Sequence, residues 1–561
     1  MALVHGFALT NLRGDVFGGL TAAVVALPLA LAFGVASGAG AIAGLYGAIF
    51  VGFFAAVFGG TPSQVSGPTG PMTVVMTAVV MKYAGDPAAA FTVVMMGGLL
   101  QILFGTLKLG RYITLMPFSV ISGFMSGIGC IIIILQLLPL PLLGFEGSPG
   151  GVIGAIEKLP DVIADLNVDA LLVGLASLAI MWLMPARLRR FLPPPLAALI
   201  VGTLLALVVL QGAPVIGLIP RGIPIPHWPT FDLTLLGDMI QSALVLALLG
   251  SIDSLLTSLI ADNVTRTQHD SDRELLGQGI GNVVAGLFGG IPGAGATMRT
   301  VVNVRAGGRT PISGALHALV LLALVLGLAP LAEGIPLAVL AGILLKVGWD
   351  IIDWDFLRRL RRAPRGDVLV MATVLLLTVF TDLVTAVGVG IIMASLLSAR
   401  QLSEIQLSQL SIVSSHNLDG TPLDDEERAI AERVGGRLLI LHLSGPFSFG
   451  SARDMISPMA VHGDSYGFVV YDLSDVSMLD TTTTMALDSL VCQARDDGRR
   501  VIVVDHGKVA AQLDDLKVLD HVDGKDRFDN RLTALRHIDR LVTEDEAHQN
   551  HHRAGQDDAA G

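Results

Sequence analysis

The sequence carries the stretch Ser66-Gly67-Pro68-Thr69-Gly70-Pro71-Met72-Thr73 and, far downstream, a similar stretch, Gly293-Ala294-Gly295-Ala296-Thr297-Met298-Arg299-Thr300. Both lie within apolar sequence, and both place Gly, Pro or Thr where a membrane-spanning helix would favour Leu. Each leads into a short apolar run. We therefore interpret them as loose backbone followed by two broken helices, whose N-termini meet in the middle of the membrane.

The composition excludes an ordinary soluble globule. Of the 561 residues, 52% are hydrophobic and 15% are charged, whereas a soluble domain carries about 25% charged residues. Apolar runs recur between residues 16 and 397, which indicates a polytopic helical protein in a lipid bilayer. Residues 1–15 show no signal-peptide pattern. Cys130 and Cys492 predict neither a disulfide framework nor a metal site, and no basic cluster predicts nucleic-acid binding.

The apolar runs predict an all-α membrane domain of about fourteen elements, seven in each half of the chain. Residues 73–83 and 297–304 are half-helices, too short to span the bilayer alone. The other elements are expected at residues 16–34, 41–58, 90–107, 120–137, 170–184 and 196–210, and then at 239–259, 275–287, 312–328, 337–352, 368–379 and 383–397.

Basic residues indicate the orientation, because Lys and Arg gather in cytoplasmic loops. Each basic cluster follows an even-numbered element, as Arg187, Arg189 and Arg190 follow the sixth. We therefore expect a multi-pass protein of the cell inner (plasma) membrane, with both termini in the cytoplasm.

The two halves repeat each other. Phe58-Gly59-Gly60-Thr61-Pro62 recurs as Phe288-Gly289-Gly290-Ile291-Pro292, and Gly129 and Gly348 keep the same register after a second shared motif. Seven elements per half place the second half upside down, and inverted repeats with interrupted helices indicate a secondary transporter with its site between the repeats. The alternative is that these Gly-rich motifs recur by chance or serve only close helix packing.

The N-termini of two half-helices suit a small oxyanion, such as bicarbonate, sulfate or a carboxylate, because each carries roughly half a positive charge and free N–H groups. The candidate ligands are the hydroxyls of Thr69 and Thr297 and the N–H groups of Gly70, Ala296, Thr297 and Met298. Each Thr hydroxyl could instead bond to its own helix. Arg299 either attracts the anion or extends toward the cytoplasm.

Asp253 is the one clear carboxylate in the middle of an expected span. Because a charge buried in the membrane is costly, such a residue is a candidate for a functional site. Thr257 lies one turn later on the same face, and carbonyls of Gly295 or Ala296 would complete an oxygen-rich site for sodium. A proton on Asp253 is the second way to neutralise it, and an ion pair with Arg299 that only joins the halves is the third. Gln278, Asn282 and Asn303 are expected to join helices.

The C-terminal part of the chain is polar and carries most of the net charge of −12. It predicts a small α/β cytoplasmic domain with strands at residues 438–443, 467–472 and 501–505 and helices at 484–497 and 530–542. We divide the chain into a membrane domain (1–400), a linker (401–432) with a polar helix at 401–419, the α/β domain (433–545) and a disordered tail (546–561). His548, His551 and His552 in that tail could bind metal or simply be solvated.

These segments resemble the SulP family of anion transporters over nearly the full length of the chain. The resemblance rests on Asn11–Asp15, Ala26-Leu27-Pro28, Gly67–Met76, Ile252–Ser258 and Gly293–Met298, and Asp472-Leu473-Ser474 with Leu479–Thr482 resembles the signature of STAS domains. Within the family, the sequence of these motifs is most similar to that of the cyanobacterial sodium-dependent bicarbonate transporters.

The resemblance implies a core and a gate domain, elevator-like motion, and a homodimer formed through the STAS domain. It implies sodium near Asp253, Thr257, Gly295 and Thr297, and bicarbonate near Thr69 and Ala296. No cofactor is expected apart from sodium as the coupling ion. STAS domains elsewhere are phosphorylated at the position that corresponds to Thr481.

Arg299 resembles instead the anion-exchanging members of the family. It keeps open a sulfate or dicarboxylate carrier that is proton-coupled or exchanging. A membrane-anchored regulator with the STAS domain as its active part is a further alternative, and an enzyme is disfavoured because no nucleophile–base pair is evident in the membrane part.

Overall fold

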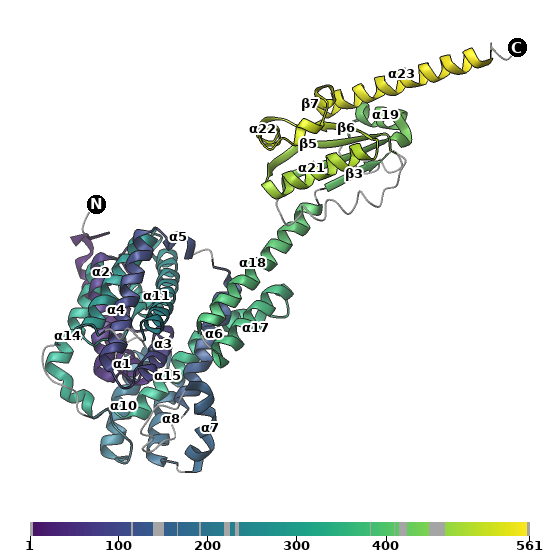
Figure 1. Ribbon diagram of the computed structural model, residues 1–561. Coiled ribbons are helices and arrows are strands. Elements are labelled where there is room, and N and C mark those ends of the chain that lie inside the picture. Colours follow the sequence, from purple (N-terminus) through teal and green to yellow (C-terminus); the bar gives the residue numbers. More distant parts are fainter. Residues whose placement is uncertain are drawn as a thin grey trace. The chain divides into compact units, whose positions relative to one another are not determined.

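The computed structural model describes residues 4–113, 116–137, 151–164, 166–189, 192–217, 225–230, 235–381, 383–408, 410–414, 423–447 and 466–557. Their contacts divide the chain into two compact units, residues 1–394 and 395–561 (Figure 1). Within these ranges, the first unit contains helices and one short strand pair, and the second is an α/β domain.

All fourteen expected membrane elements are helices. The first half contains α1 (Leu12–Ala36), α2 (Ala41–Phe58), α3 (Gly70–Lys82), α4 (Pro87–Thr106), α6 (Phe118–Gln136), α8 (Val168–Leu183) and α10 (Pro194–Val208). The second contains α11 (Leu236–Thr265), α12 (Ser271–Leu287), α13 (Thr297–Arg305), α14 (Pro311–Glu333), α15 (Leu337–Ile351), α17 (Arg365–Phe380) and α18 (Leu383–Ser408). Within the described residues, six helices are long and apolar enough to cross a membrane by length and composition, and α3, α8, α10 and part of α14 are shorter apolar helices.

Sequence patterns missed several shorter helices because they lie in the connections between apolar runs. These are η1 (Leu9–Asn11), α5 (Gly110–Ile113), α7 (Gly151–Ala164), α9 (Ala186–Arg189) and α16 (Trp354–Arg359). Local caps explain where several long helices begin: the side chains of Asp86, Asp270 and Thr310 accept hydrogen bonds from the first turns of α4, α12 and α14.

The helices form two bundles that mix both halves of the chain. In the core bundle, α1–α4 pack with α11–α14, and in the gate bundle, α6, α8 and α10 pack with α15 and α17 (Figure 1). Corresponding glycines of the two repeats meet in the gate bundle, where a Cβ atom on Gly129 would lie 2.6 Å from the carbonyl oxygen of Gly348. The recurring Gly motif therefore lets α6 and α15 cross with their backbones in contact.

The C-terminal unit is built on a five-stranded sheet of order β3-β4-β5-β6-β7. Strand β3 (Leu410–Ser414) is antiparallel to β4 (Leu438–Phe447), and the remaining strands β5 (Phe468–Leu479), β6 (Arg500–Val504) and β7 (Arg527–Phe528) are parallel. Helices α21 (Thr481–Asp496) and α22 (Gly507–Asp515) cover one face, whereas α19 (Asp425–Val434) and α23 (Arg531–Asp557) cover the other. Short 3₁₀ turns are η2 (Gly435–Arg437), η3 (Val518–His521) and η4 (Gly524–Asp526).

The expected strands and helices of this domain are confirmed, with two differences. The polar helix expected at 401–419 is present to Ser408 but wrong at residues 410–414, because these form the edge strand β3, whose backbone pairs with β4. The tail expected to be disordered from residue 546 continues as α23 to Asp557, in keeping with its helix-forming Glu, Ala, Gln and Arg residues. The side chains of His548, His551 and His552 lie outside the described ones.

Candidate functional site

The two interrupted stretches meet, as the sequence predicts. Strand β1 (Ser66–Gly67) is antiparallel to β2 (Ala294–Gly295), with Ser66 opposite Gly295 and Gly67 opposite Ala294. Each strand leads directly into a half-helix, with the extended residues Thr69 and Ala296 as the N-caps of α3 and α13. The strand pair therefore holds the N-termini of both half-helices side by side inside the core bundle.

Glycine makes this close pairing possible. A Cβ atom on Gly293 would lie 2.6 Å from the carbonyl carbon of Gly67, and Gly67 itself has φ +148°. Asn282 binds both backbone groups of Gly293, with its Oδ1 2.8 Å from the nitrogen and its Nδ2 3.0 Å from the oxygen. The side chain of a neighbouring helix thus supplies the partners that an isolated two-residue strand lacks.

The expected sodium ligands converge on one side of the strand pair. The Thr257 hydroxyl donates to the Gly295 carbonyl at 3.0 Å and lies 2.8 Å from the Thr297 hydroxyl. Asp253 lies one turn earlier on α11 and is 9% exposed, and its buried Oδ2 has no hydrogen-bond partner. Hydroxyl and carbonyl oxygens from α11 and the β2–α13 junction therefore meet one helical turn from the Asp253 carboxylate, and a hard cation prefers oxygen ligands of these kinds.

The expected anion ligands lie at the starts of the two half-helices. The Thr69 hydroxyl is buried without a hydrogen-bond partner, and it lies near enough to Asp253 to interact with it outside regular hydrogen-bond geometry. It is Thr73, one turn later, whose hydroxyl bonds to the Thr69 carbonyl at 2.7 Å. The alternative that the Thr69 hydroxyl bonds back to its own helix is therefore wrong.

The N–H of Ala296 is not free to bind an anion. It donates to the Val65 carbonyl at 2.9 Å as part of the strand pairing, so the expectation of a free donor there is wrong. Helix geometry leaves the N–H groups of Gly70 in α3 and of Thr297 and Met298 in α13 without a carbonyl of their own helix.

Arg299 connects the two interrupted stretches. Its side chain is 2% exposed, and its Nη2 donates to the carbonyl of Pro68, whereas Nη1 is buried without a hydrogen-bond partner. Extension toward the cytoplasm is therefore wrong. No ion pair within 4.0 Å joins Arg299 to Asp253, both of which belong to the described part of the chain, so a direct ion pair between them is also wrong.

Two further buried carboxylates were missed from the sequence, because each lies one residue before an expected span. Glu274 accepts hydrogen bonds from the N–H groups of Gly60 and Thr61 and from Gln64 and Gln278, at 2.8–3.0 Å. Asp15 accepts from Asn11, Arg309 and Thr310. Both join segments that are distant in sequence, whereas Asp253 keeps an unpartnered oxygen.

The three polar residues expected to join helices do so. Gln278 donates to Ser66 and Glu274, and Asn303 donates to Ser63 and Ser313. Asn282 donates to Gln101 at 2.8 Å in addition to its contacts with Gly293. These contacts tie the strand pair and its neighbouring segments to the surrounding helices.

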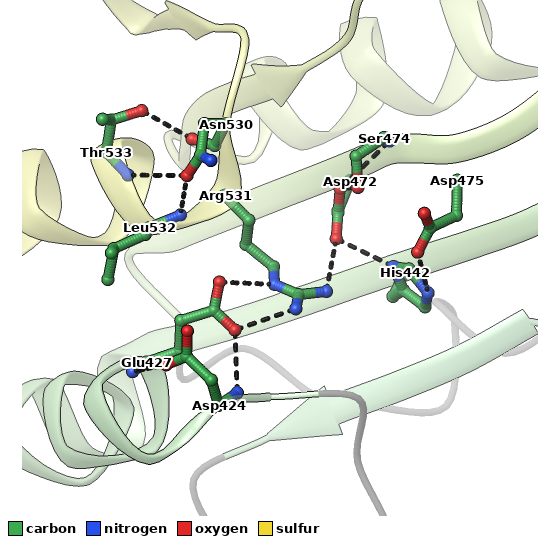
Figure 2. A network of polar contacts seen from close by, with 10 residues as sticks. All are labelled: Asp424, Glu427, His442, Asp472, Ser474, Asp475, Asn530, Arg531, Leu532 and Thr533. Atoms are coloured by element: carbon green, nitrogen blue, oxygen red, sulfur yellow. Dashed lines mark hydrogen bonds and ion pairs between the residues drawn. The ribbon is translucent and has the colours of Figure 1, made fainter.

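The STAS-like signature forms a buried network of charges in the C-terminal domain (Figure 2). Asp472 is fully buried and accepts from Arg531 Nη1 at 3.0 Å, and its Oδ2 lies 2.8 Å from His442 Nδ1. Arg531 also forms two hydrogen bonds to Glu427, at 2.8 and 3.0 Å. Burial by itself raises the pKa of Asp472, but hydrogen bonds from His442 and Ser474 outweigh it and lower the pKa to about 2. The network ties α19, β4, β5 and α23 together.

Comparison with known proteins matches two families to this chain. Residues 12–374 match the sulfate permease family, and residues 429–532 match the STAS domain. The chain is 48% identical to the bicarbonate transporter BicA of Synechocystis sp. over 96% of both chains, and 47% identical to BicA of Picosynechococcus sp. over 93% of this chain and 94% of that one. The solved transmembrane domain of a cyanobacterial BicA matches with a TM-score of 0.65 and 54% identity, covering 69% of this chain and all of that one.

Proposed function

Because the chain belongs to the sulfate permease family, whose members are anion transporters and not enzymes, we propose that it imports bicarbonate together with sodium. The relatives named bicarbonate transporters support this substrate. The proposal assigns sodium to Asp253, Thr257, Gly295 and Thr297. It assigns the anion to Thr69, Gly70, Thr297, Met298 and Arg299, with Ala296 only shaping the start of α13.

The pairing of β1 with β2 is the observation that carries the proposal. It brings oxygen ligands from α11 and α13 next to the positive ends of two half-helices. A cation and an anion can therefore bind within one small volume, each reducing the electrostatic cost of the other.

Charge balance couples the two ions. The buried side chains of Asp253 and Arg299 carry opposite charges, and each has an unpartnered polar atom. Sodium satisfies the carboxylate, bicarbonate satisfies the guanidinium and the helix N-termini, and the loaded site carries about the same net charge as the empty one. Either ion alone would leave a net charge in a poorly solvated site, which costs several kcal/mol, so joint binding permits movement of the core bundle against the gate bundle.

The direct test is uptake of labelled bicarbonate into liposomes that contain the purified protein. We expect an inward sodium gradient to drive uptake and Asp253→Asn to abolish that dependence. Asp238→Asn is the matched control, because Asp238 lies on the same helix α11 but is 48% exposed and pairs with Lys82 near the surface. Sodium-dependent uptake that survives in Asp253→Asn would remove Asp253 from the site.

A proton-coupled or exchanging sulfate or dicarboxylate carrier is the second candidate, and the buried guanidinium of Arg299 favours it. A divalent anion would be better matched by that charge. Sulfate uptake that follows the external pH and ignores sodium would establish this candidate and reject the first one.

The proposed setting is a plasma-membrane homodimer in which both termini are cytoplasmic and the STAS domains pair. The supporting observations are the distribution of basic residues and the separate compact C-terminal unit. Light scattering of the full chain and of a chain ending at Arg400 tests the dimer, since the truncated protein is expected to be monomeric.

A further inference from the structure

Three side chains of metal-binding type lie together on the face of the C-terminal sheet that α21 and α22 cover. Among the residues that the structure describes, Asp488, Cys492 and His521 are the one group of three His, Cys, Asp or Glu side chains whose ligand atoms lie within 4.8 Å of one another. Asp488 and Cys492 are one turn apart on α21, and His521 ends η3. They are separated by up to 33 residues, so their spacing in the sequence does not reveal the group.

Both elements that carry these side chains are anchored in the core. Leu487, Leu490 and Val491 of α21 are at most 3% exposed, and Val518 of η3 is 1% exposed. Since α21 and η3 pack against each other, the three ligand atoms are presented by elements whose positions are set by the hydrophobic core. His521 is 47% exposed, which leaves it room to turn and leaves a path for an ion.

One oxygen of the Asp488 carboxylate lacks a hydrogen-bond donor. Asp488 Oδ1 is buried without a hydrogen bond, and His521 Nε2 lies 3.9 Å away, beyond hydrogen-bond range. Burial of a carboxylate oxygen without a donor is unfavourable. Burial and the neighbouring carboxylates of Asp488 and Asp496 raise the pKa of the Cys492 thiol, whereas Arg495 opposes this effect.

We propose that Asp488, Cys492 and His521 bind Zn²⁺, with water as the fourth ligand. One oxygen, one sulfur and one nitrogen ligand suit a borderline metal and disfavour Mg²⁺ or Ca²⁺. On binding, the Cys492 thiol releases its proton to solvent and the thiolate forms the Zn–S bond, without any redox change. The ion would join η3 to α21.

The test uses the full-length protein in detergent, stripped of metal by a chelator and titrated with Co²⁺. Cobalt occupies zinc sites and reports thiolate ligands through a charge-transfer band. We expect one such site per chain, displaced by Zn²⁺, with release of one proton measured from binding heats in buffers of different ionisation enthalpy. Cys492→Ser should abolish the band, and Asp488→Asn or His521→Gln should weaken Zn²⁺ binding by at least about 10-fold.

The chain supplies matched controls. Cys130→Ser removes the only other cysteine, which lies in α6, and it should keep the band. Replacing His548, His551 and His552 by Ala should keep it as well. The proposal is overturned if the wild-type protein shows no thiolate band, if the band persists in Cys492→Ser, or if the tail variant loses it. The isosteric Asp488→Asn keeps the test valid should Cys492→Ser fail to fold.

Discussion

The hydroxyl of Thr257 on α11 lies 2.8 Å from the hydroxyl of Thr297 at the start of α13. The same Thr257 hydroxyl is 3.0 Å from the Gly295 carbonyl. One side chain therefore links the long helix that carries Asp253 to the strand and half-helix of the second interrupted stretch.

Replacing Thr257 by Val should weaken sodium binding without changing the size of the side chain. The variant loses one hydroxyl ligand and leaves the Gly295 carbonyl without its donor, which costs about 1–2 kcal/mol. The sodium concentration for half-maximal uptake should rise about 10-fold. Thr265→Val on the same helix is the control, because the Thr265 hydroxyl bonds to the Ala261 carbonyl and to Thr267, away from the site.

Replacing Gly293 by Ala should disrupt the strand pair. The added Cβ atom would lie 2.6 Å from the backbone of Gly67, and such a contact cannot be relieved by moving a flexible side chain. We expect transport to be lost and the membrane domain to be destabilised by about 1–3 kcal/mol. Gly85→Ala, where the added atom meets nothing within 4 Å, should leave both unchanged.

Glu274→Gln should destabilise the core bundle. The carboxylate accepts four hydrogen bonds, and an amide group would turn an N–H toward at least one of those donors. The loss should be about 2–4 kcal/mol, seen as a lower unfolding temperature in detergent. Glu404→Gln provides the comparison, since Glu404 is 64% exposed and forms a surface ion pair with Arg400. Equal unfolding temperatures for the two variants would contradict the assignment.

The C-terminal domain should lose stability in acid. The pKa of Asp472 is lowered to about 2 in the folded domain, whereas an unfolded Asp titrates at about 3.9. A lowered folded-state pKa contributes stability that is fully present above about pH 3.9 and is lost as the pH falls toward 2. The contribution is about 3 kcal/mol.

Denaturant unfolding of this domain between pH 6 and 2 measures that slope. Asp472→Asn should lower stability at neutral pH, because His442 and Arg531 lose a charged partner, and should flatten the acid dependence. A wild-type slope that is unchanged in Asp472→Asn would assign the acid sensitivity to other carboxylates.

Much of the fold was accessible from the sequence because membrane helices are specified locally. In lipid, the backbone hydrogen bonds of an apolar run must be formed within the run itself, so it becomes a helix whatever segments surround it. The fourteen helices and the two interruptions followed from that rule, as did the prominence of Asp253. The edge strand at 410–414 did not, because its strand form depends on pairing with β4.

The sequence by itself determined which apolar segments are helices, where two of them break, and which carboxylate stands out in the apolar part. Only the tertiary structure decided that the Ala296 N–H donates to the Val65 carbonyl and that Arg299 donates to the Pro68 carbonyl. It also decided that Glu274 is buried, and that His521 lies beside Asp488 and Cys492. These relationships join residues far apart in the chain. They arise from packing between elements, for which no local pattern of residues provides a signal.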